Sequence, residues 1–355
     1  MMTKMGEDFH SVCPHETTRL DEDRCFYNLR FLTEGRKAKI YAAKHHNYDD
    51  FIILKCVLQD RTKKDDFLRE FHYSFYLSPH PNIVNSFDVA FSTSKFFVFA
   101  QELAPEGDLS LDPTTQNGFG EVKTKLIIEQ ITFALEYVHI KDLVYRDICL
   151  QNIYAYSKDL KTVKLGDFGM TRKNGTLLKK TGIRSQWAPP EVCQASKKDG
   201  YYVHRSQDVW QMGILIFVCL TGAYPWRTAE MSDEHYASWI TWLKRKTNKI
   251  PSRFKCFSPR LLILFRHLLE PVPNQRAENK EVYKYLADPW LLMETNHQDV
   301  NIDYSSANIF VKSYKFSERL VKKKLIDFLL SYTVKKIKDK TVTPKPRRSI
   351  SMIEI

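Results

Sequence analysis

The pattern of apolar residues between positions 26 and 103 predicts strands and one helix. Three short runs rich in β-branched and aromatic residues, 40–43, 51–57 and 96–102, are typical of strands. Between the second and third runs, residues 65–77 show a helical pattern that ends at a proline-containing segment. Together these elements predict a small antiparallel sheet against which a single helix packs.

Beyond residue 104 the apolar positions follow the period of an α-helix. The segments 122–141, 207–220 and 259–269 each place their apolar residues on one face. These segments predict a lobe built from helices. The face of the first segment consists of Ile127, Ile131, Ala134, Leu135 and Val138.

The change from strands to helices falls at Ala104-Pro105-Glu106-Gly107, whose proline and glycine suit a hinge between two lobes. The expected fold is therefore α+β and bilobal, with a small antiparallel β-sheet lobe carrying one helix and a larger helical lobe. Small ligands usually bind in the crevice at such a domain interface. The expected parts are an N-terminal extension (1–25), the small lobe (26–103), the helical lobe (104–292) and a basic C-terminal tail (293–355).

Basic residues are concentrated in this tail. The 355-residue chain carries a formal net charge of +12, and the segment 312–348 alone holds 13 Lys and Arg against 3 Asp and Glu. Within it, residues 316–337 have an apolar side and a lysine-rich side, which predicts a basic amphipathic helix. The apolar side would either dock on the helical lobe or contact an anionic membrane or a partner.

The end of the tail offers a weaker partner signal. Pro344-Lys345-Pro346-Arg347 suggests a ligand for an SH3 domain, although the P-x-x-P spacing is absent. No recognisable reading module accompanies the basic cluster, so we expect no nucleic-acid partner.

Cysteine usage indicates a protein of a reducing compartment, and the apolar runs indicate neither a signal peptide nor a membrane span. The seven cysteines are scattered without C-x-x-C pairs, which disfavours a structural zinc site and a secreted disulfide framework. Residues 1–20 lack the apolar block of a signal peptide. The longest apolar run, 212–220, is far shorter than the roughly 20 residues that span a bilayer, so we expect a buried helix there.

Two carboxylates and an amide follow one another in an order typical of phosphoryl transfer from Mg·ATP. Asp147 follows Tyr145-Arg146, Asn152 comes five residues later, and Asp167 opens the segment Asp167-Phe168-Gly169. In such a site the first Asp accepts the proton of the attacking hydroxyl, while the Asn and the second Asp hold metal ions. The sequence therefore predicts Asp147 and Arg146 as catalytic residues, and Asn152 and Asp167 as Mg²⁺ ligands.

The remaining motifs resemble those of the protein kinase superfamily, in the order that the family requires. Ile52-Ile53-Leu54-Lys55 stands where the family has V-A-I-K on its third strand, and Glu70 lies in the helix predicted after it. The resemblance implies that Lys55 is a catalytic residue that pairs with the α- and β-phosphates of ATP, and that Glu70 holds it extended. It also implies a structural ion pair of Glu191 with Arg276, and a buried support for the catalytic loop at Asp208.

Three segments, 99–105, 167–172 and 190–195, are similar to those of the SH3-binding-domain serine/threonine kinases, and the similarity covers about residues 26–292. It implies a cytoplasmic enzyme that uses ATP and Mg²⁺ to phosphorylate Ser or Thr of protein substrates. Carried over residue by residue, it implies these nucleotide contacts: Lys55, Glu70, Gly35, Ile40, Ile53, Gln101, Glu102, Leu103, Ala104 and Tyr154.

Several residues depart from the family's pattern at the nucleotide site. Only Gly35 remains of the glycines in the phosphate loop, and Ile53 and Tyr154 are bulkier than the residues that usually flank adenine. Cys149 replaces the lysine that usually steadies the γ-phosphate. These departures leave a second hypothesis open, a pseudokinase that acts as a binding or scaffold module with weak or no catalysis.

Three threonines, Thr171, Thr176 and Thr181, lie between Asp167 and Glu191. A phosphate on one of them could pair with Arg146 and order this loop. Threonines in such loops more often carry no phosphate, so both interpretations stay open.

Overall fold

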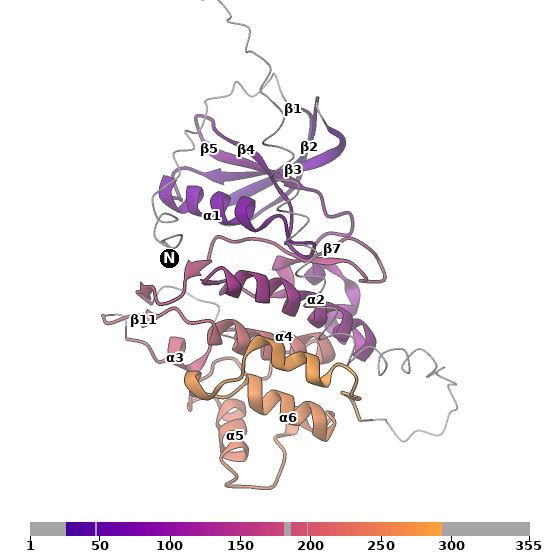
Figure 1. The fold of residues 1–355 in the computed structure, drawn as a ribbon, viewed down its shortest axis with the longest axis vertical. Helices are drawn as coiled ribbons and strands as arrows, with labels where there is room; N and C mark the ends of the chain where they lie inside the picture. Colours follow the sequence, from indigo (N-terminus) through magenta and orange to yellow (C-terminus); the bar gives the residue numbers. More distant parts are fainter. Residues whose placement is uncertain (1–25, 47, 181–185, 197, 293–355) are drawn as a thin grey trace, which may run out of the picture. The chain divides into compact units, whose positions relative to one another are not determined.

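In this computed structural model we describe residues 26–46, 48–180, 186–196 and 198–292. All of them belong to one compact unit, residues 1–294. The fold is α+β and bilobal, as predicted, with a sheet at one end of the unit and helices at the other (Figure 1). The predicted N-terminal extension and the predicted tail, with its amphipathic helix and its SH3-domain and membrane contacts, lie outside the described residues.

A five-stranded antiparallel sheet and α1 (Lys64–Leu77) form the small lobe. In sheet order the strands are β1 (Phe26–Glu34), β2 (Ala38–His45), β3 (Tyr48–Leu58), β5 (Phe96–Glu102) and β4 (Ser86–Ser92). The predicted helix and the three predicted strands are confirmed as α1, β2, β3 and β5, whereas the apolar pattern did not predict β1 and β4.

One face of the sheet is covered by α1. Phe67 and Phe71 of the helix are buried against Val57 and Phe99 of the sheet. Burying one aromatic side chain of this size stabilises a fold by about 1.5–3 kcal/mol. Because side chains alternate along a strand, Lys55, two residues before Val57, points to the same face. The packing of α1 therefore determines which groups Lys55 meets.

Three long helices form the interior of the second lobe: α2 (Gly120–Ile140), α4 (Ser206–Thr221) and α6 (Pro259–Leu268). They confirm the helices predicted there. Residues 206–220 of α4 are all buried, so the apolar run 212–220 is an interior helix, as expected. No helix of the described ranges has the length and apolar character needed to cross a membrane.

Shorter helices complete this lobe, and α5 (Glu234–Leu243) among them was not predicted from the sequence. Its N-terminus is capped by Asp233, whose carboxylate accepts hydrogen bonds from two backbone N–H groups. The remaining elements are α3 (Pro190–Cys193), α5 (Glu234–Leu243) and the 3₁₀ helices η2 (Leu109–Leu111), η3 (Pro113–Gln116), η4 (Leu150–Asn152), η5 (Ser252–Phe254), η6 (Pro273–Gln275) and η7 (Asn279–Tyr285).

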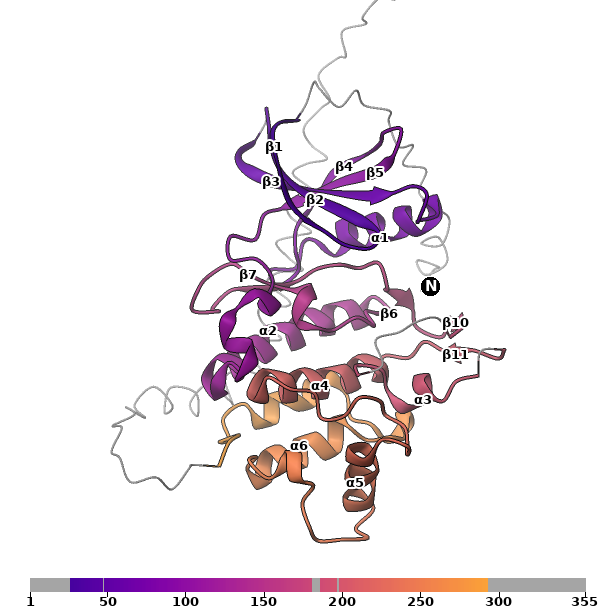
Figure 2. The ribbon, with the colours of Figure 1, turned by 180° about the vertical axis from the view of Figure 1, so that it is seen from behind.

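Pairs of short strands fix the loops that carry the predicted chemistry. Asn152 directly precedes β7 and Gly166 directly follows β8, and the Gly166 N–H donates to the Asn152 carbonyl at 2.9 Å. This pairing brings the catalytic loop, residues 145–152, beside the segment that begins at Asp167. The pairs are β6 (Leu143–Val144) with β9 (Arg172–Lys173), β7 (Ile153–Ala155) with β8 (Val163–Leu165), and β10 (Leu177–Leu178) with β11 (Tyr201–Tyr202) (Figure 2).

Candidate active site

Lys55 joins the two lobes through ion pairs with two carboxylates. Its Nζ lies 2.5 Å from Glu70 Oε1 on α1 and 3.0 Å from Asp167 Oδ2. Glu70 reaches it because it lies on the stripe of α1 that also carries Phe67 and Phe71. Burial alone would lower the pKa of Lys55, but Asp167 and Glu70 outweigh this effect and raise it above its ordinary value. Lys55 is therefore held as a cation at the position where the sequence predicts phosphate binding.

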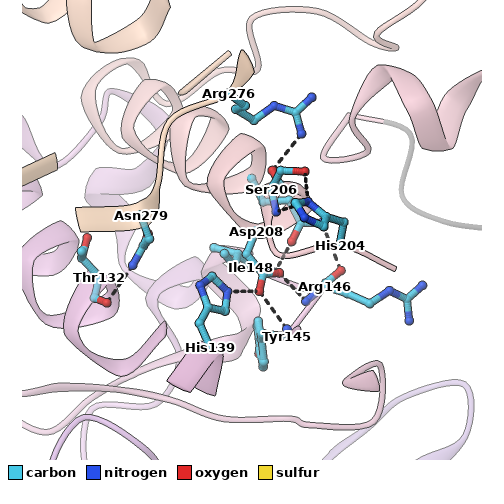
Figure 3. A network of polar contacts seen from close by, with 11 residues as sticks. Thr132, His139, Tyr145, Arg146, Ile148, His204, Ser206, Asp208, Arg276 and Asn279 are labelled. Carbon is cyan, nitrogen blue, oxygen red and sulfur yellow. Dashed lines mark hydrogen bonds and ion pairs between the residues drawn. The ribbon is translucent and has the colours of Figure 1, made fainter. Parts of the chain in front are cut away.

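Asp208, in the first turn of α4, anchors the backbone of the catalytic loop. Its two carboxylate oxygens accept hydrogen bonds from the backbone N–H groups of Tyr145 (2.8 Å) and Arg146 (2.7 Å), and one of them also lies 2.7 Å from His139 Nε2 (Figure 3). One turn along α4, the side-chain amide of Gln211 donates to the carbonyl of Arg146 at 3.0 Å. The predicted buried support at Asp208 is confirmed, and it fixes the backbone directly before Asp147.

Asn152 orients the carboxylate that the sequence predicts as the proton acceptor. Its side-chain nitrogen donates to Asp147 Oδ2 at 3.0 Å and to the Asp147 carbonyl at 2.8 Å. The Asn152 side-chain oxygen is the atom with which this residue could bind a cation, since Mg²⁺ prefers oxygen ligands. Asp147 and Asn152 thus form one unit, as their five-residue spacing predicts.

Asp167 has a backbone conformation that turns the chain sharply. Its φ is +53°, and its Oδ1 accepts a hydrogen bond from the Gly169 N–H at 3.2 Å. Phe168 is buried with its ring edge-on to that of Tyr145, at 5.3 Å between centroids. The Tyr145 hydroxyl donates to the Gly166 carbonyl. These contacts bind the catalytic loop to the segment that begins at Asp167 at several points.

Three of the predicted nucleotide contacts, Ile40, Ile53 and Gln101, lie on the face of the sheet that carries Lys55. Ile40 pairs with Lys55 across β2 and β3, and Ile53 pairs with Gln101 across β3 and β5. Cross-strand partners project from the same face. Gly35 lies in the turn between β1 and β2, where its N–H donates to the Ala38 carbonyl at 2.8 Å.

The segment after β5 connects the lobes. Glu102 Oε1 accepts hydrogen bonds from the Asn85 N–H at 2.7 Å and from Lys164 Nζ at 2.6 Å, so its side chain is engaged within the protein. Leu103 and Ala104 follow as half-buried residues outside any helix or strand, and the Ala104 carbonyl accepts a hydrogen bond from the Gly107 N–H at 3.2 Å. Their remaining backbone groups are polar atoms that a base could meet.

Tyr154 occupies the space over a glycine. A Cβ placed on Gly166 would lie only 2.7 Å from Tyr154 Cε2 and 3.0 Å from a methyl carbon of Val84. Burial, with a smaller contribution from Asp167, raises the pKa of Tyr154 to about 12, so its hydroxyl is neutral at physiological pH. The bulk that departs from the family's pattern is therefore accommodated by the missing side chain at position 166.

Cys149 and Arg146 of the catalytic loop are both buried within the protein. Cys149 is fully buried in the catalytic loop and supplies no cation. The Arg146 side chain extends away from Asp208 (Figure 3) and donates to the Met170 carbonyl at 2.7 Å and to the Tyr201 hydroxyl at 2.5 Å. The Arg146 guanidinium is thus bonded to residues outside the catalytic loop.

The expected ion pair of the second lobe is confirmed. Arg276 forms a two-point contact with Glu191, each N···O distance being 3.0 Å, and also donates to the Ser206 carbonyl at 2.8 Å. Planar two-point pairs of this kind are strong and specific. This pair connects α3 with the start of α4.

Four residues of the site were missed by the sequence-based reasoning: His139, Gln211, Tyr201 and Gly166. Gln211 carried a signal, because it is a polar residue three positions after Asp208 inside an apolar helix. Gly166 carried one as well, since a glycine directly before Asp167 offers room for a large residue nearby. His139 and Tyr201 become visible only through long-range contacts.

Comparison with known proteins agrees with this geometry. The family model described as "Protein kinase domain" matches residues 26–291. The chain is 39% identical to "Serine/threonine-protein kinase SBK1" of Danio rerio, over 84% of this chain and 78% of that protein. It is 40% identical to "Serine/threonine-protein kinase meng-po" of Drosophila melanogaster, over 75% of this chain and 59% of that protein. It is 27% identical to "Serine/threonine-protein kinase SBK2" of Rattus norvegicus, over 83% of this chain and 82% of that protein.

The chain therefore belongs to the protein kinase family. The SBK names also agree with the narrower resemblance drawn from the three sequence segments. Protein kinases in general use ATP and Mg²⁺ and act on proteins.

Proposed function

We propose that this chain is an ATP-dependent protein serine/threonine kinase, which transfers the γ-phosphate of Mg·ATP to Ser and Thr hydroxyls of protein substrates. The observation that carries the proposal is the position of Lys55, whose Nζ bridges Glu70 and Asp167 at 2.5 and 3.0 Å. In kinases this lysine and the metal-binding Asp must both be in place for catalysis. The names of the relatives support serine and threonine as acceptors.

The residues present fit Mg·ATP. Asp167 and Asn152 offer side-chain oxygens of the kind that Mg²⁺ prefers, and Lys55 offers a cation beside them. When bound, Mg·ATP supplies the transferable phosphoryl group and a metal that neutralises charge developing on the phosphates. We assign the base to the space between Ile53 and Tyr154, next to the backbone of Glu102, Leu103 and Ala104.

Some residues of the site position the phosphates, and others accept a proton or orient the acceptor. Lys55, held by Glu70, pairs with the α- and β-phosphates. Asp147 accepts the proton of the acceptor hydroxyl, and Asn152 keeps its carboxylate in the required orientation through the 3.0 Å hydrogen bond. Asp208 contributes without touching substrate, because it fixes the backbone that carries Asp147.

The pseudokinase hypothesis is less well supported. Ile53 and Tyr154 motivated it, but the Tyr154 ring lies in space that Gly166 leaves free. Cys149 remains a departure, and by analogy with the loss of one oxyanion donor a missing cation could slow the chemical step by on the order of 10²-fold. We therefore expect a slow kinase whose ion pairs are intact.

The test is transfer of radiolabelled γ-phosphate to a mixture of acceptor proteins, followed by identification of the labelled amino acid. We expect phosphoserine and phosphothreonine from the wild type and a loss of at least about 100-fold in Asp147→Asn. Asp159→Asn, which changes an exposed carboxylate of the same lobe, is the matched control and should behave like the wild type. Equal labelling by wild type and Asp147→Asn would refute the proposal.

A further inference from the structure

The Arg146 guanidinium is occupied by protein groups. One terminal nitrogen donates to the Met170 carbonyl at 2.7 Å and the other to the Tyr201 hydroxyl at 2.5 Å. The guanidinium carbon also lies 5.8 Å from the centroid of the Tyr201 ring, within range of a cation–π contact. Arg146 and Tyr201 are each 8% exposed, so water competes little for the hydrogen bond between them.

Arg146 stands between the two halves of the catalytic site. Its backbone N–H is held by Asp208, and Asp147 follows it directly in the chain. Its side chain holds Met170, three residues after Asp167. Its φ of +74° is unusual for a residue with a side chain, so the backbone keeps this conformation only while its surroundings impose it.

Tyr201 is itself fixed by a small strand pair. In the ladder of β10 with β11, Tyr201 pairs with Leu178, and the bond from the Val203 N–H to the Thr176 carbonyl (2.8 Å) continues the contact. Gly200 before it has φ +74°, and a Cβ there would lie 2.2 Å from the Leu178 carbonyl oxygen. The backbone around Tyr201 therefore tolerates little displacement of the hydroxyl.

Two further arginines near this position also have protein partners. Arg172 donates to the carbonyls of Gly169 (3.0 Å) and Thr171 (2.7 Å), and Arg69 pairs with Asp66. Burial, together with the charges of Arg69 and Arg146, lowers the pKa of Arg172 to about 10. These cations would attract a phosphate, yet each already has an acceptor within the protein.

The described threonines are poorly placed to supply that phosphate. Thr171 is completely buried. The Thr176 hydroxyl donates to the Lys173 carbonyl at 2.7 Å, within the turn that precedes β10. The third candidate, Thr181, lies outside the described residues.

We propose that Tyr201 is a positioning residue for phosphoryl transfer, whose hydroxyl holds Arg146 where an activating phosphate would otherwise bind. The catalytic loop and the segment after Asp167 are then aligned without phosphorylation. This inference rests on the proposed function of the site, since it concerns how that site is kept in its working arrangement.

The first test compares Tyr201→Phe, which removes only the hydroxyl, with Tyr202→Phe. Tyr202 is the next residue of the same strand and is 67% exposed, so its variant should match the wild type. Losing a hydrogen bond to a charged group should lower kcat of Tyr201→Phe by about 10- to 100-fold. The KM for ATP should stay within about threefold, because Tyr201 touches none of the nucleotide contacts. A Tyr201→Phe variant as active as the wild type would overturn the inference.

The second test asks whether a phosphate is needed. Wild-type protein treated with a phosphatase, and shown by intact mass to carry no phosphate, should keep its initial rate of transfer within about twofold after the phosphatase is removed. A loss of activity that returns on phosphorylation would overturn the inference.

A third measurement is independent of activity. Hydrogen exchange of the peptide 171–178 should be at least about tenfold faster in Tyr201→Phe than in wild type, whereas exchange within α4 should be unchanged. Equal exchange in the two proteins would refute the role of Tyr201, whether or not transfer is detected. Faster exchange with no transfer by the wild type would instead refute the proposed function and leave the structural coupling in place.

Discussion

The contact between Tyr154 and Gly166 gives the sharpest prediction about the nucleotide site. Gly166→Ala adds one methyl group whose carbon would lie 2.7 Å from Tyr154 Cε2, where ordinary contacts begin at 3.4 Å. The overlap is about 0.7 Å, which is too large for small local adjustments. The added carbon would also lie 3.0 Å from a methyl carbon of Val84, so it has little room to shift and the Tyr154 ring must move away from Gly166.

We expect Gly166→Ala to lower the free energy of unfolding by about 1–3 kcal/mol, the usual cost of overpacking. The displaced ring should also enter the space assigned to the base. If the displaced ring makes the nucleotide-bound state less stable by about 1.4 kcal/mol, the dissociation constant for Mg·ATP rises about tenfold. Urea unfolding and calorimetric titration with Mg·ATP measure the two quantities.

The second variant, Tyr154→Leu, provides the control. In its background the same Gly166→Ala change should have little effect on either quantity, because the atom that causes the overlap is gone. The coupling energy between the two positions should then exceed about 1 kcal/mol. Equal effects of Gly166→Ala in both backgrounds would contradict the reasoning.

Three further predictions concern the buried residues His80, Arg276 and Asp208. Burial lowers the pKa of His80 to about 3, so at low pH the unfolded chain takes up a proton that the folded chain does not. The free energy of unfolding should therefore fall as the pH drops below about 6.5, by up to about 1.4 kcal/mol per pH unit, and it should fall less in His80→Asn. Urea titrations at pH 7 and 5 that give the same loss of stability for the two proteins would contradict this. Arg276→Leu should lower the free energy of unfolding by about 3–5 kcal/mol, because it leaves Glu191 without its partner. Lys161→Ala, which breaks an exposed ion pair, should have almost no effect. Similar losses in the two variants would argue against a stabilising role of the Arg276 pair. Asp208→Asn places a side-chain N–H donor against a backbone N–H donor of the catalytic loop. We expect kcat to fall at least about tenfold while the affinity for ATP is kept. An equal fall in kcat and in ATP affinity would exclude a role of Asp208 that is limited to the catalytic loop.

The apolar pattern predicted those elements whose buried residues follow one period. The α1 helix, for example, buries Phe67, Phe71, Ser74 and Leu77 on a single stripe. β1 was missed because it is an edge strand in which only Phe26 is buried, so burial imposes no alternation on its sequence. α5 was missed although Tyr236, Trp239 and Ile240 have helical spacing, since its aromatic and β-branched residues also suit a strand.

The charged residues of the site could be predicted because their spacing reflects the chemistry. Asp147 and Asn152 lie on one loop, and the hydrogen bond between them is local. The supports of this loop come from far along the chain, as with Asp208, 62 residues after Arg146. A long-range contact such as that of Tyr201 with Arg146 leaves no periodic signal, so only the folded chain reveals it.

If Lys55 and Asp167 form a binding site for Mg·ATP, calorimetric titration of the wild type beside Asp167→Asn will show it. We expect the wild type to bind ATP and Mg²⁺ to tighten this binding at least about tenfold. In Asp167→Asn the effect of Mg²⁺ should largely disappear, because one oxygen ligand and its charge are lost. No detectable binding of Mg·ATP by the wild type at millimolar concentration would show that Lys55 and Asp167 do not form such a site.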